Sequence, residues 1–326
     1  MTCSTCASAS ARVAAIDIGT VTCRLLVADV DAEGLHELRR AHAITNLGEG
    51  VATSGVLLPQ AMQRVDEQME RFMGIVEECR DEAHPDIVVV AMATSAARDA
   101  RNASEFTALL VARGIELSVI PGEREAELSF KGASSSFPAE PLFVVDVGGG
   151  STEVIAGTAG EAPQFRRSFN IGCRRVTELF LRTDPPTGSE LQEAKAWART
   201  EMEPFFSEVR AAGFEPRALA AVAGTATSIA AMHLRLEHYD AEKVHLSRID
   251  RTTLDALAQR VSALPLEERR QVVGLEPDRA PVIVAGLAIL QTVLDASGMD
   301  AFTVSETDIL HGIVLDTAAR LADGRF

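Results

Sequence analysis

The sequence predicts an α/β protein of two similar lobes that face each other across a cleft. The first observation is an approximate internal repeat, because residues 13–28 and 142–156 follow one pattern. In each segment an apolar strand ends in an Asp-x-Gly turn with hydroxyl residues, and a second apolar strand follows. The second observation is that strand-like and helix-like segments alternate along much of the remaining chain, as in α/β proteins. Each hairpin therefore opens one lobe.

Composition and charge narrow the class of protein. The chain has 326 residues, of which 47% are hydrophobic and 24% are charged, and these values fit a folded protein of two ordinary domains. The net charge of −16 argues against a general affinity for nucleic acid or for an anionic membrane. A polyanionic substrate would therefore need a locally positive cleft. Because the apolar stretches are too short for a bilayer span, we expect no membrane contact.

The N-terminal residues 1–11 are small and polar, and we expect them to form a mobile tail. This segment lacks the basic and apolar regions of a secretory signal, so we expect a cytoplasmic protein. Cys3 and Cys6 form a lone Cys-x-x-Cys in the tail, and a zinc site would need a second pair that the other three cysteines do not provide.

The first lobe is predicted over residues 12–136 and the second over residues 137–326. Apolar periodicity after the first hairpin predicts helices at 60–80, 103–113 and 123–131 and strands at 86–93 and 116–120. The boundary falls within 134–138, where small residues and a proline separate a helix from a strand.

In the second lobe, the same patterns predict a strand at 218–222 and helices at 189–211, 251–263, 280–297 and 308–321. Ser189 and Gln192 are spaced as a capping box, and Pro204 predicts a kink or a break in the same helix. For the last helix, packing back on the first lobe is left open.

The glycine-rich turns predict phosphate binding, because backbone N–H groups can converge on an anion where side chains are absent. The Walker pattern is absent, and the Rossmann pattern fails because Gly148 to Thr152 leads into a strand instead of a helix. Two Asp-x-Gly loops and a Gly-Thr turn at 224–225 fit the actin-like (ribonuclease H-like) ATPase architecture. There Asp17 and Asp146 could hold Mg²⁺ or its waters. For either aspartate alone, a strand-end turn is the simpler interpretation.

Several motifs carry a wider resemblance. They are Ala15-Ile-Asp17-Ile-Gly19-Thr20-x-Thr22-x-Arg24-Leu25, Leu47-Gly48-Glu49-Gly50-Val51, Thr94-x-x-Ala97-Arg98-x-Ala100-x-Asn102, Gly122-x-x-Glu125-Ala126, Val145-Asp146-Val-Gly148-Gly-Gly150-Ser151-Thr152-Glu153, Gly172-x-x-Arg175-x-Thr177-Glu178, Asp184-Pro185-Pro186-Thr187, Gly224-Thr225 and Gly274-Leu-x-Pro-x-Arg279-Ala280. With these motifs the chain resembles the exopolyphosphatase and guanosine pentaphosphate phosphohydrolase family from residue 13 to about residue 321. It looks like the short form, which has two actin-like lobes without additional helical domains.

The resemblance implies that Glu125 is the catalytic base and that Arg98 binds the phosphate beside it. A carboxylate in a cleft can take a proton from the attacking water, while a guanidinium spans phosphate oxygens. Without the family pattern, Glu125 near a helix start would be interpreted as a capping residue, which the helix dipole favours without any catalysis. The phosphate-binding residues are expected to be Gly19, Thr20, Thr22, Arg24, Gly148, Gly149, Gly150, Ser151, Thr152, Gly224, Thr225 and Arg279. Mg²⁺ is the expected cofactor, with Asp17, Asp146 and Glu153 as its carboxylates.

The positive side chains expected in the cleft are Arg24, Arg98, Arg124, Lys131 and Arg279. Three positions depart from the family pattern. Val21 replaces an asparagine between the hydroxyl residues of the first loop, Arg124 replaces a glutamate before the expected base, and Leu310 replaces an arginine near the C-terminus. We expect Val21 and Leu310 to remove polar contacts and Arg124 to add positive charge to the site.

Four functions are weighed. The first is an exopolyphosphatase that releases orthophosphate from inorganic polyphosphate with Mg²⁺, and the second is removal of the 5′ γ-phosphate of guanosine pentaphosphate. A kinase of actin-like fold is third, and the lack of an acceptor-sugar motif counts against it. A polyphosphate or alarmone sensor with a weakened site is fourth, supported by Val21 and Leu310. Partners other than the phosphate substrate are not expected, with a homodimer left open.

Overall fold

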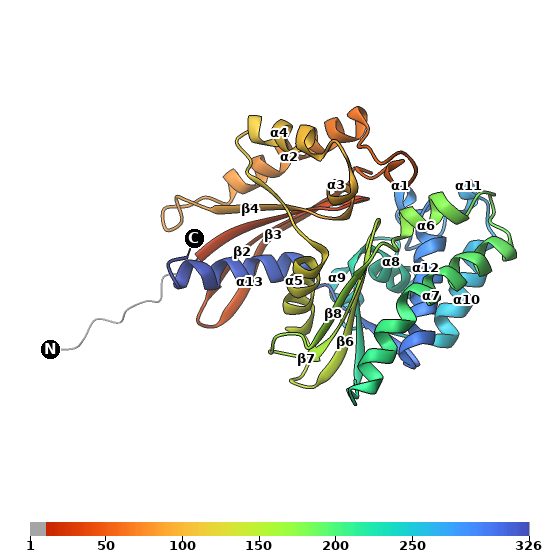
Figure 1. Ribbon diagram of the computed structural model, residues 1–326. Helices are drawn as coiled ribbons and strands as arrows, with labels where there is room; N and C mark the ends of the chain where they lie inside the picture. Colours follow the sequence, from red (N-terminus) through yellow and green to blue (C-terminus); the bar gives the residue numbers. More distant parts are fainter. Residues whose placement is uncertain (1–10, 326) are drawn as a thin grey trace.

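The computed structural model describes residues 11–325, and it consists of two α/β lobes (Figure 1). Nearly all of the predicted tail, including Cys3 and Cys6, lies outside the described residues. The first sheet has the strand order β3-β2-β1-β4-β5. Its strands are β1 (Ala11–Ile18), β2 (Thr22–Asp31), β3 (Gly34–Ile44), β4 (Val88–Ala93) and β5 (Leu117–Val119).

The second sheet has the strand order β10-β11-β9-β6-β7-β8. Its strands are β6 (Pro141–Val147), β7 (Thr152–Thr158), β8 (Phe165–Phe169), β9 (Ala218–Val222), β10 (Arg248–Asp250) and β11 (Ala301–Val304). The run β8-β7-β6-β9-β11 repeats the order of the first sheet, with antiparallel pairing in the hairpin and parallel pairing beyond it. The predicted α/β class with two similar lobes is therefore confirmed.

The two hairpins match residue by residue at their tips. Asp17 on β1 lies opposite Arg24 on β2, and Asp146 on β6 lies opposite Glu153 on β7. Both strands of each hairpin are largely buried, since apolar residues fill them on both faces. The Asp-x-Gly turns therefore stand at one end of rigid, buried elements, and each lobe presents one turn to the other.

The helices flank the sheets. In the first half of the chain they are α1 (Val51–Ser54), α2 (Pro59–Glu78), α3 (Ser95–Asp99), α4 (Ala103–Ala112) and α5 (Gly122–Ser134). In the second half they are α6 (Cys173–Phe180), α7 (Gly188–Ala211), α8 (Ala223–Leu234), α9 (Ala241–Val244), α10 (Arg251–Ser262), α11 (Leu266–Arg269), α12 (Ile283–Ser297) and α13 (Ile309–Ala322). The predicted long helices and strands agree with these bounds to within a few residues.

Helix α7 differs from its prediction at its start. Its capping box joins Thr187 and Glu190, not Ser189 and Gln192, and Thr187 Oγ1 accepts from the Glu190 backbone N–H at 3.3 Å. The helix also continues through Pro204 without a break. The start is shifted because Thr187 has the extended backbone of an N-cap, while Ser189 already lies inside the helix.

The last helix, α13, packs against α5 and against β1 and β2 of the first sheet (Figure 1). Leu310 is buried in the apolar cluster that these elements share, together with Val13, Leu26 and Ile313. The chain crosses between the two sheets twice: α5, which follows β5 of the first sheet, packs against β6, β7 and β8 of the second, and α13, which follows β11 of the second sheet, packs against the first. The boundary at 136/137 stays a prediction.

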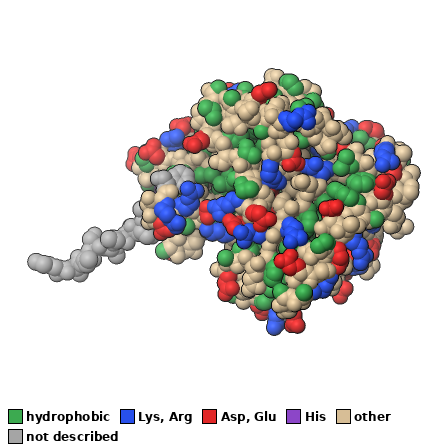
Figure 2. Space-filling model, in the orientation of Figure 1, with side chains coloured by type: hydrophobic (Ala, Val, Ile, Leu, Met, Phe, Trp, Pro, Cys, Tyr) green, Lys and Arg blue, Asp and Glu red, His purple; other side chains and the backbone are tan. Residues whose placement is uncertain are grey.

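Acidic and basic side chains are interspersed on the face of the molecule drawn in Figure 2. No helix within residues 11–325 is both long enough and apolar enough to cross a membrane.

Candidate active site

A cavity of about 590 Å³ lies between the two hairpin tips. Most of the predicted site residues line it: Asp17, Gly19, Thr20, Thr22, Arg24, Glu125, Asp146, Gly148, Gly149, Gly150, Ser151, Gly224, Thr225 and Arg279. Arg98 and Glu153 lie behind this lining. The structure therefore brings together residues that are as far apart as 17 and 279 in the sequence.

The two loops approach each other so closely that the second one needs its glycines. A Cβ atom on Gly149 would lie 2.6 Å from Val21 Cγ2, and one on Gly150 would lie 2.5 Å from Ser95 Oγ. Both contacts join the two lobes. From the sequence, Val21 was expected only to remove a polar contact. In the structure its side chain is buried in the apolar cluster of the second lobe. The valine at this position therefore supplies an apolar contact between the lobes.

Glu125 lies in the first turns of α5 with its side chain buried. The Nη1 atom of Arg98 donates to Glu125 Oε2 at 3.0 Å and to the Ile120 carbonyl at 3.0 Å. Burial raises the pKa of Glu125 to about 8, against the opposing charge of Arg98 and with a contribution from Asp146. A residue that only caps a helix would not need this ion pair with Arg98. The contact therefore favours a role for Glu125 in the site. A carboxylate with such a pKa is suited to exchange a proton near neutral pH.

Two further carboxylates lie close to Glu125 and have raised pKa values. Asp146 Oδ2 accepts from Ser129 Oγ at 2.9 Å, and burial raises the pKa of Asp146 to about 6 although Arg24 opposes the shift. Glu153 Oε1 accepts from Ser168 Oγ at 2.6 Å, and burial together with Glu125 raises its pKa. Asp146 and Glu153 are thus buried carboxyl groups whose hydrogen-bond partners here are serine hydroxyls.

This donor set suits a divalent cation. Carboxylate oxygens are the ligands that Mg²⁺ prefers, and Mg²⁺ usually takes only one or two of them and keeps waters and substrate phosphates as its other ligands. The described residues contain no group of three or more His, Cys, Asp or Glu side chains arranged to hold a metal by themselves. Asp17 and Asp146 at the cavity wall therefore fit a cation that arrives with phosphate.

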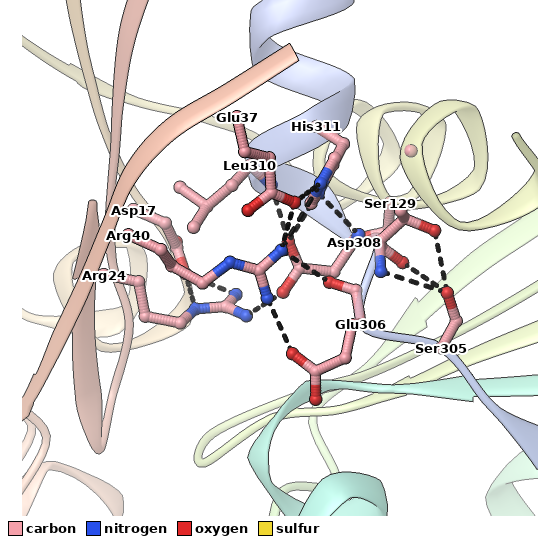
Figure 3. A network of polar contacts seen from close by, with 12 residues as sticks. Asp17, Arg24, Glu37, Arg40, Ser129, Ser305, Glu306, Asp308, Leu310 and His311 are labelled. Carbon is pink, nitrogen blue, oxygen red and sulfur yellow. Dashed lines mark hydrogen bonds and ion pairs between the residues drawn. The ribbon is translucent and has the colours of Figure 1, made fainter. Parts of the chain in front are cut away.

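An ion-pair network surrounds Arg24 at one wall of the cavity (Figure 3). Its Nη2 donates to Asp17 Oδ2 at 2.7 Å, and its Nη1 donates to Asp308 on the segment before α13. Burial alone would raise the pKa of Asp308, but Arg24 and His311 lower it overall. Arg24 is thus held between two carboxylates and keeps the remaining N–H groups for a ligand.

Asp308 and Arg40 also line the cavity, although neither was predicted as a site residue from the sequence. Arg40 Nη1 donates to Glu306 Oε2 at 2.6 Å, and its Nη2 donates to Glu37 at 2.7 Å. Asp308 could have been noticed as an N-cap, because it is the first residue of the predicted helix 308–321. Arg40 has no comparable signal in the sequence.

Three residues that were predicted in the site do not line the cavity. Arg124 and Lys131 do not line the cavity; both pair with Asp316 on α13, Lys131 at 3.6 Å. Their positions on α5 face the neighbouring helix, so Arg124 adds no positive charge to the cleft. Thr152 does not line the cavity either, and its hydroxyl donates to the Ile171 carbonyl. Its role is to hold the strand after the loop.

Arg279 joins the cavity from the second lobe. Its Nη2 donates to Thr22 Oγ1 at 3.3 Å, across the cleft. Gly224 leaves room for it, since a Cβ there would lie 2.2 Å from Arg279 Nη1. The predicted Gly-Thr turn at 224–225 thus forms the start of α8, and Gly224 packs directly against the guanidinium of Arg279.

Comparison with known proteins identifies the family. A model of the Ppx/GppA phosphatase family matches residues 26–321. Exopolyphosphatase 2 of Mycobacterium tuberculosis is 36% identical over 324 residues, covering 94% of this chain and 98% of that protein. The solved structure of an exopolyphosphatase-like protein is 34% identical with a TM-score of 0.88, covering 96% of this chain and 99% of that one. An exopolyphosphatase structure from Cytophaga hutchinsonii is 27% identical with a TM-score of 0.85, covering 94% of this chain and 98% of that one.

The matches extend over both lobes and nearly the full length of each relative. The family match includes the segments that carry Arg98, Glu125 and the second phosphate loop. On these grounds the chain belongs to the Ppx/GppA phosphatase family.

Proposed function

We propose that the protein is an exopolyphosphatase, which hydrolyses the terminal phosphoanhydride of inorganic polyphosphate and releases orthophosphate. The observation that carries the proposal is the buried Glu125 with its raised pKa, held by Arg98 beside a cavity that two glycine loops and Arg24 line. The similarity to exopolyphosphatases over nearly the whole chain supports the same reaction.

In this reaction the oxygen of a water molecule attacks the terminal phosphorus, and the bridging P–O bond breaks. Glu125 takes a proton from the water, and the shortened chain leaves with the bridging oxygen. The N–H groups of the glycine loops and Arg24 hold the terminal phosphate and balance its negative charge. Arg98 keeps the Glu125 carboxylate in place.

We also propose Mg²⁺ as the cofactor, with Asp17 and Asp146 as its carboxylates and Glu153 behind Asp146. When bound, the ion neutralises phosphate charge and orients the chain end. Support for this assignment comes from the buried carboxyl group of Asp146, because a cation would relieve its raised pKa.

A second candidate substrate is guanosine pentaphosphate. Apolar and aromatic side chains such as Leu236, Tyr239, Leu275 and Pro277 also line the cavity. Such a wall suits a nucleoside better than it suits a long polyanion. A homodimer and a cytoplasmic location stay predictions.

A phosphate-release assay distinguishes these substrates. Purified protein is mixed with long-chain polyphosphate, guanosine pentaphosphate or ATP, each with and without Mg²⁺. We expect the largest kcat/KM for long-chain polyphosphate and little release without Mg²⁺. A larger kcat/KM for guanosine pentaphosphate would make the second candidate the function, and release from none of the three would contradict both.

A further inference from the structure

N–H groups of helix α6 donate hydrogen bonds to the backbone carbonyls of the second phosphate loop, residues 148–150. The backbone N–H groups of Cys173 and Arg174 donate to the carbonyls of Gly148 and Gly149 at 2.9 and 2.8 Å. The side chain of Arg175 donates from Nε to the Gly150 carbonyl at 2.9 Å. In a trans peptide the C=O and the following N–H point in opposite directions. The loop N–H groups of residues 149–151 are therefore turned away from α6.

The other end of the Arg175 guanidinium reaches the first lobe. Its Nη2 donates to Asp99 on α3, the residue that follows Arg98. Only 16% of the Arg175 side chain is exposed, so water competes little for this ion pair. One guanidinium thus joins the phosphate loop of the second lobe to the helix that carries Arg98, and its planar fork suits two acceptors that lie in different directions.

The neighbouring Arg174 also joins the lobes, but by a different route. Its side chain donates to Asn46 and pairs with Glu178 at 3.5 Å, and Glu178 accepts from the Gly50 N–H at 3.1 Å. These contacts bring α6 beside α1 (Figure 1). Within residues 11–325, the hydrogen bond and ion pair of the Arg174 side chain do not involve the second phosphate loop. Arg174 therefore provides a matched control, with a contact between the lobes but no side-chain contact to this loop.

We propose that Arg175 is a positioning residue that fixes the second phosphate loop relative to Arg98. This inference rests on the proposed hydrolysis of a terminal phosphate. The loop N–H groups bind the phosphate, and Arg98 holds the base Glu125, so the attack geometry depends on the distance between α3 and residues 148–150. Arg175 bonds both parts. It does not touch the substrate itself.

Loss of this bridge should lower kcat more than it changes KM. A misplacement of about 1 Å in a reacting geometry can cost on the order of 10²-fold in rate, while the remaining loop and arginine contacts still bind the polyanion. We therefore expect Arg175→Ala to lower kcat by about 10–100-fold and to change KM less than about threefold. Arg175→Lys keeps the charge but reaches only one acceptor. Its kcat should therefore lie between those of the wild-type protein and Arg175→Ala.

The experiment compares Arg175→Ala, Arg175→Lys, Asp99→Ala, the double variant of Arg175 and Asp99, and Arg174→Ala. Orthophosphate release from long-chain polyphosphate gives kcat and KM. The double variant should lose no more kcat than Arg175→Ala alone, because both changes remove the same bridge. Arg174→Ala should keep kcat within about threefold of the wild-type value. Equal losses in Arg174→Ala, or a near-wild-type kcat in Arg175→Ala, would overturn the proposal.

Amide hydrogen exchange on the unliganded protein tests the same bridge without catalysis. Residues 148–151 and 95–99 should exchange faster in Arg175→Ala but not in Arg174→Ala. If the wild-type protein releases no orthophosphate from polyphosphate, the proposed function fails while this measurement still decides on the bridge. Unchanged exchange in both segments would overturn the role of Arg175, whatever the substrate is.

Discussion

At the scale of single residues, the site combines groups that local sequence reveals with groups that only the fold brings in. Asp17 and Asp146 stand in Asp-x-Gly turns, and these turns are recognisable because glycine and hydroxyl residues interrupt apolar strands. Asp308 contacts Arg24 from a position 284 residues away. No local pattern encodes such a contact, since it depends on the last helix returning to the first sheet. The role of Glu125 came from the family resemblance and not from its local pattern.

Glu125→Gln should abolish most of the turnover and leave the fold intact. The glutamine is nearly isosteric and can still accept from Arg98, but it cannot take the proton of the attacking water. A general base typically contributes about 10²–10⁴-fold, so kcat should fall by that factor. Orthophosphate release measures the rate, and circular dichroism checks the fold. A variant with near-wild-type release would remove Glu125 from the mechanism.

Asp146→Asn should raise the Mg²⁺ concentration needed for half-maximal activity more than it raises KM for polyphosphate. The amide keeps the hydrogen-bonding oxygen for Ser129, but it lacks the charge that attracts the ion. Titration of Mg²⁺ at saturating polyphosphate measures the effect, with Thr292→Val on α12 as a control for loss of a buried hydrogen bond far from the site. An unchanged metal requirement would reassign Asp146 to a structural turn.

At the scale of helices and strands, most elements could be predicted because apolar periodicity is strong in them. The details that failed depend on particular contacts. The capping box of α7 uses Thr187 because only that residue has the extended N-cap backbone, and two candidate starts lie too close for pattern alone to separate. Arg124 and Lys131 were expected in the cleft, but the packing of α13 on α5 offers Asp316 as their partner.

The crossing of α5 and α13 leads to a prediction for stability. A Cβ atom on Gly312 would lie 1.9 Å from the Leu128 carbonyl oxygen, so Gly312→Ala must push the helices apart. We expect a loss of about 1–3 kcal/mol in the free energy of unfolding, measured in urea. Gly74→Ala on α2 is the matched control, because nothing lies within 4 Å of its Cβ, and it should gain up to about 1 kcal/mol of helix propensity. Equal stability of the two variants would contradict the close crossing.

At the scale of the whole molecule, the internal repeat was the most informative part of the sequence. Two hairpins with one pattern predicted two lobes, and the common strand order of both sheets confirms this. The sequence could not say where the cations of a chain with net charge −16 gather. The fold answers this by bringing Arg24, Arg40 and Arg279 to one cavity while other arginines pair with acids on the surface.

Arg279 reaches the cavity from the second lobe, so its removal tests how the assembled cleft binds a chain. Arg279→Ala should raise KM for long-chain polyphosphate with a smaller effect on kcat, the pattern of lost uniform binding. Steady-state kinetics on long chains and on tripolyphosphate measure the difference. Equal losses on both substrates would show that Arg279 does not contact the extended part of the polymer.

The central claim is that the cleft removes phosphate only from the chain end. Phosphorus NMR of long-chain polyphosphate during the reaction tests it directly, because end groups, internal groups and orthophosphate give separate signals. The account predicts that orthophosphate grows at the expense of internal groups while the number of end groups stays constant until the chains are short. An early rise in end groups, or no orthophosphate from a folded, Mg²⁺-supplied protein, would contradict it.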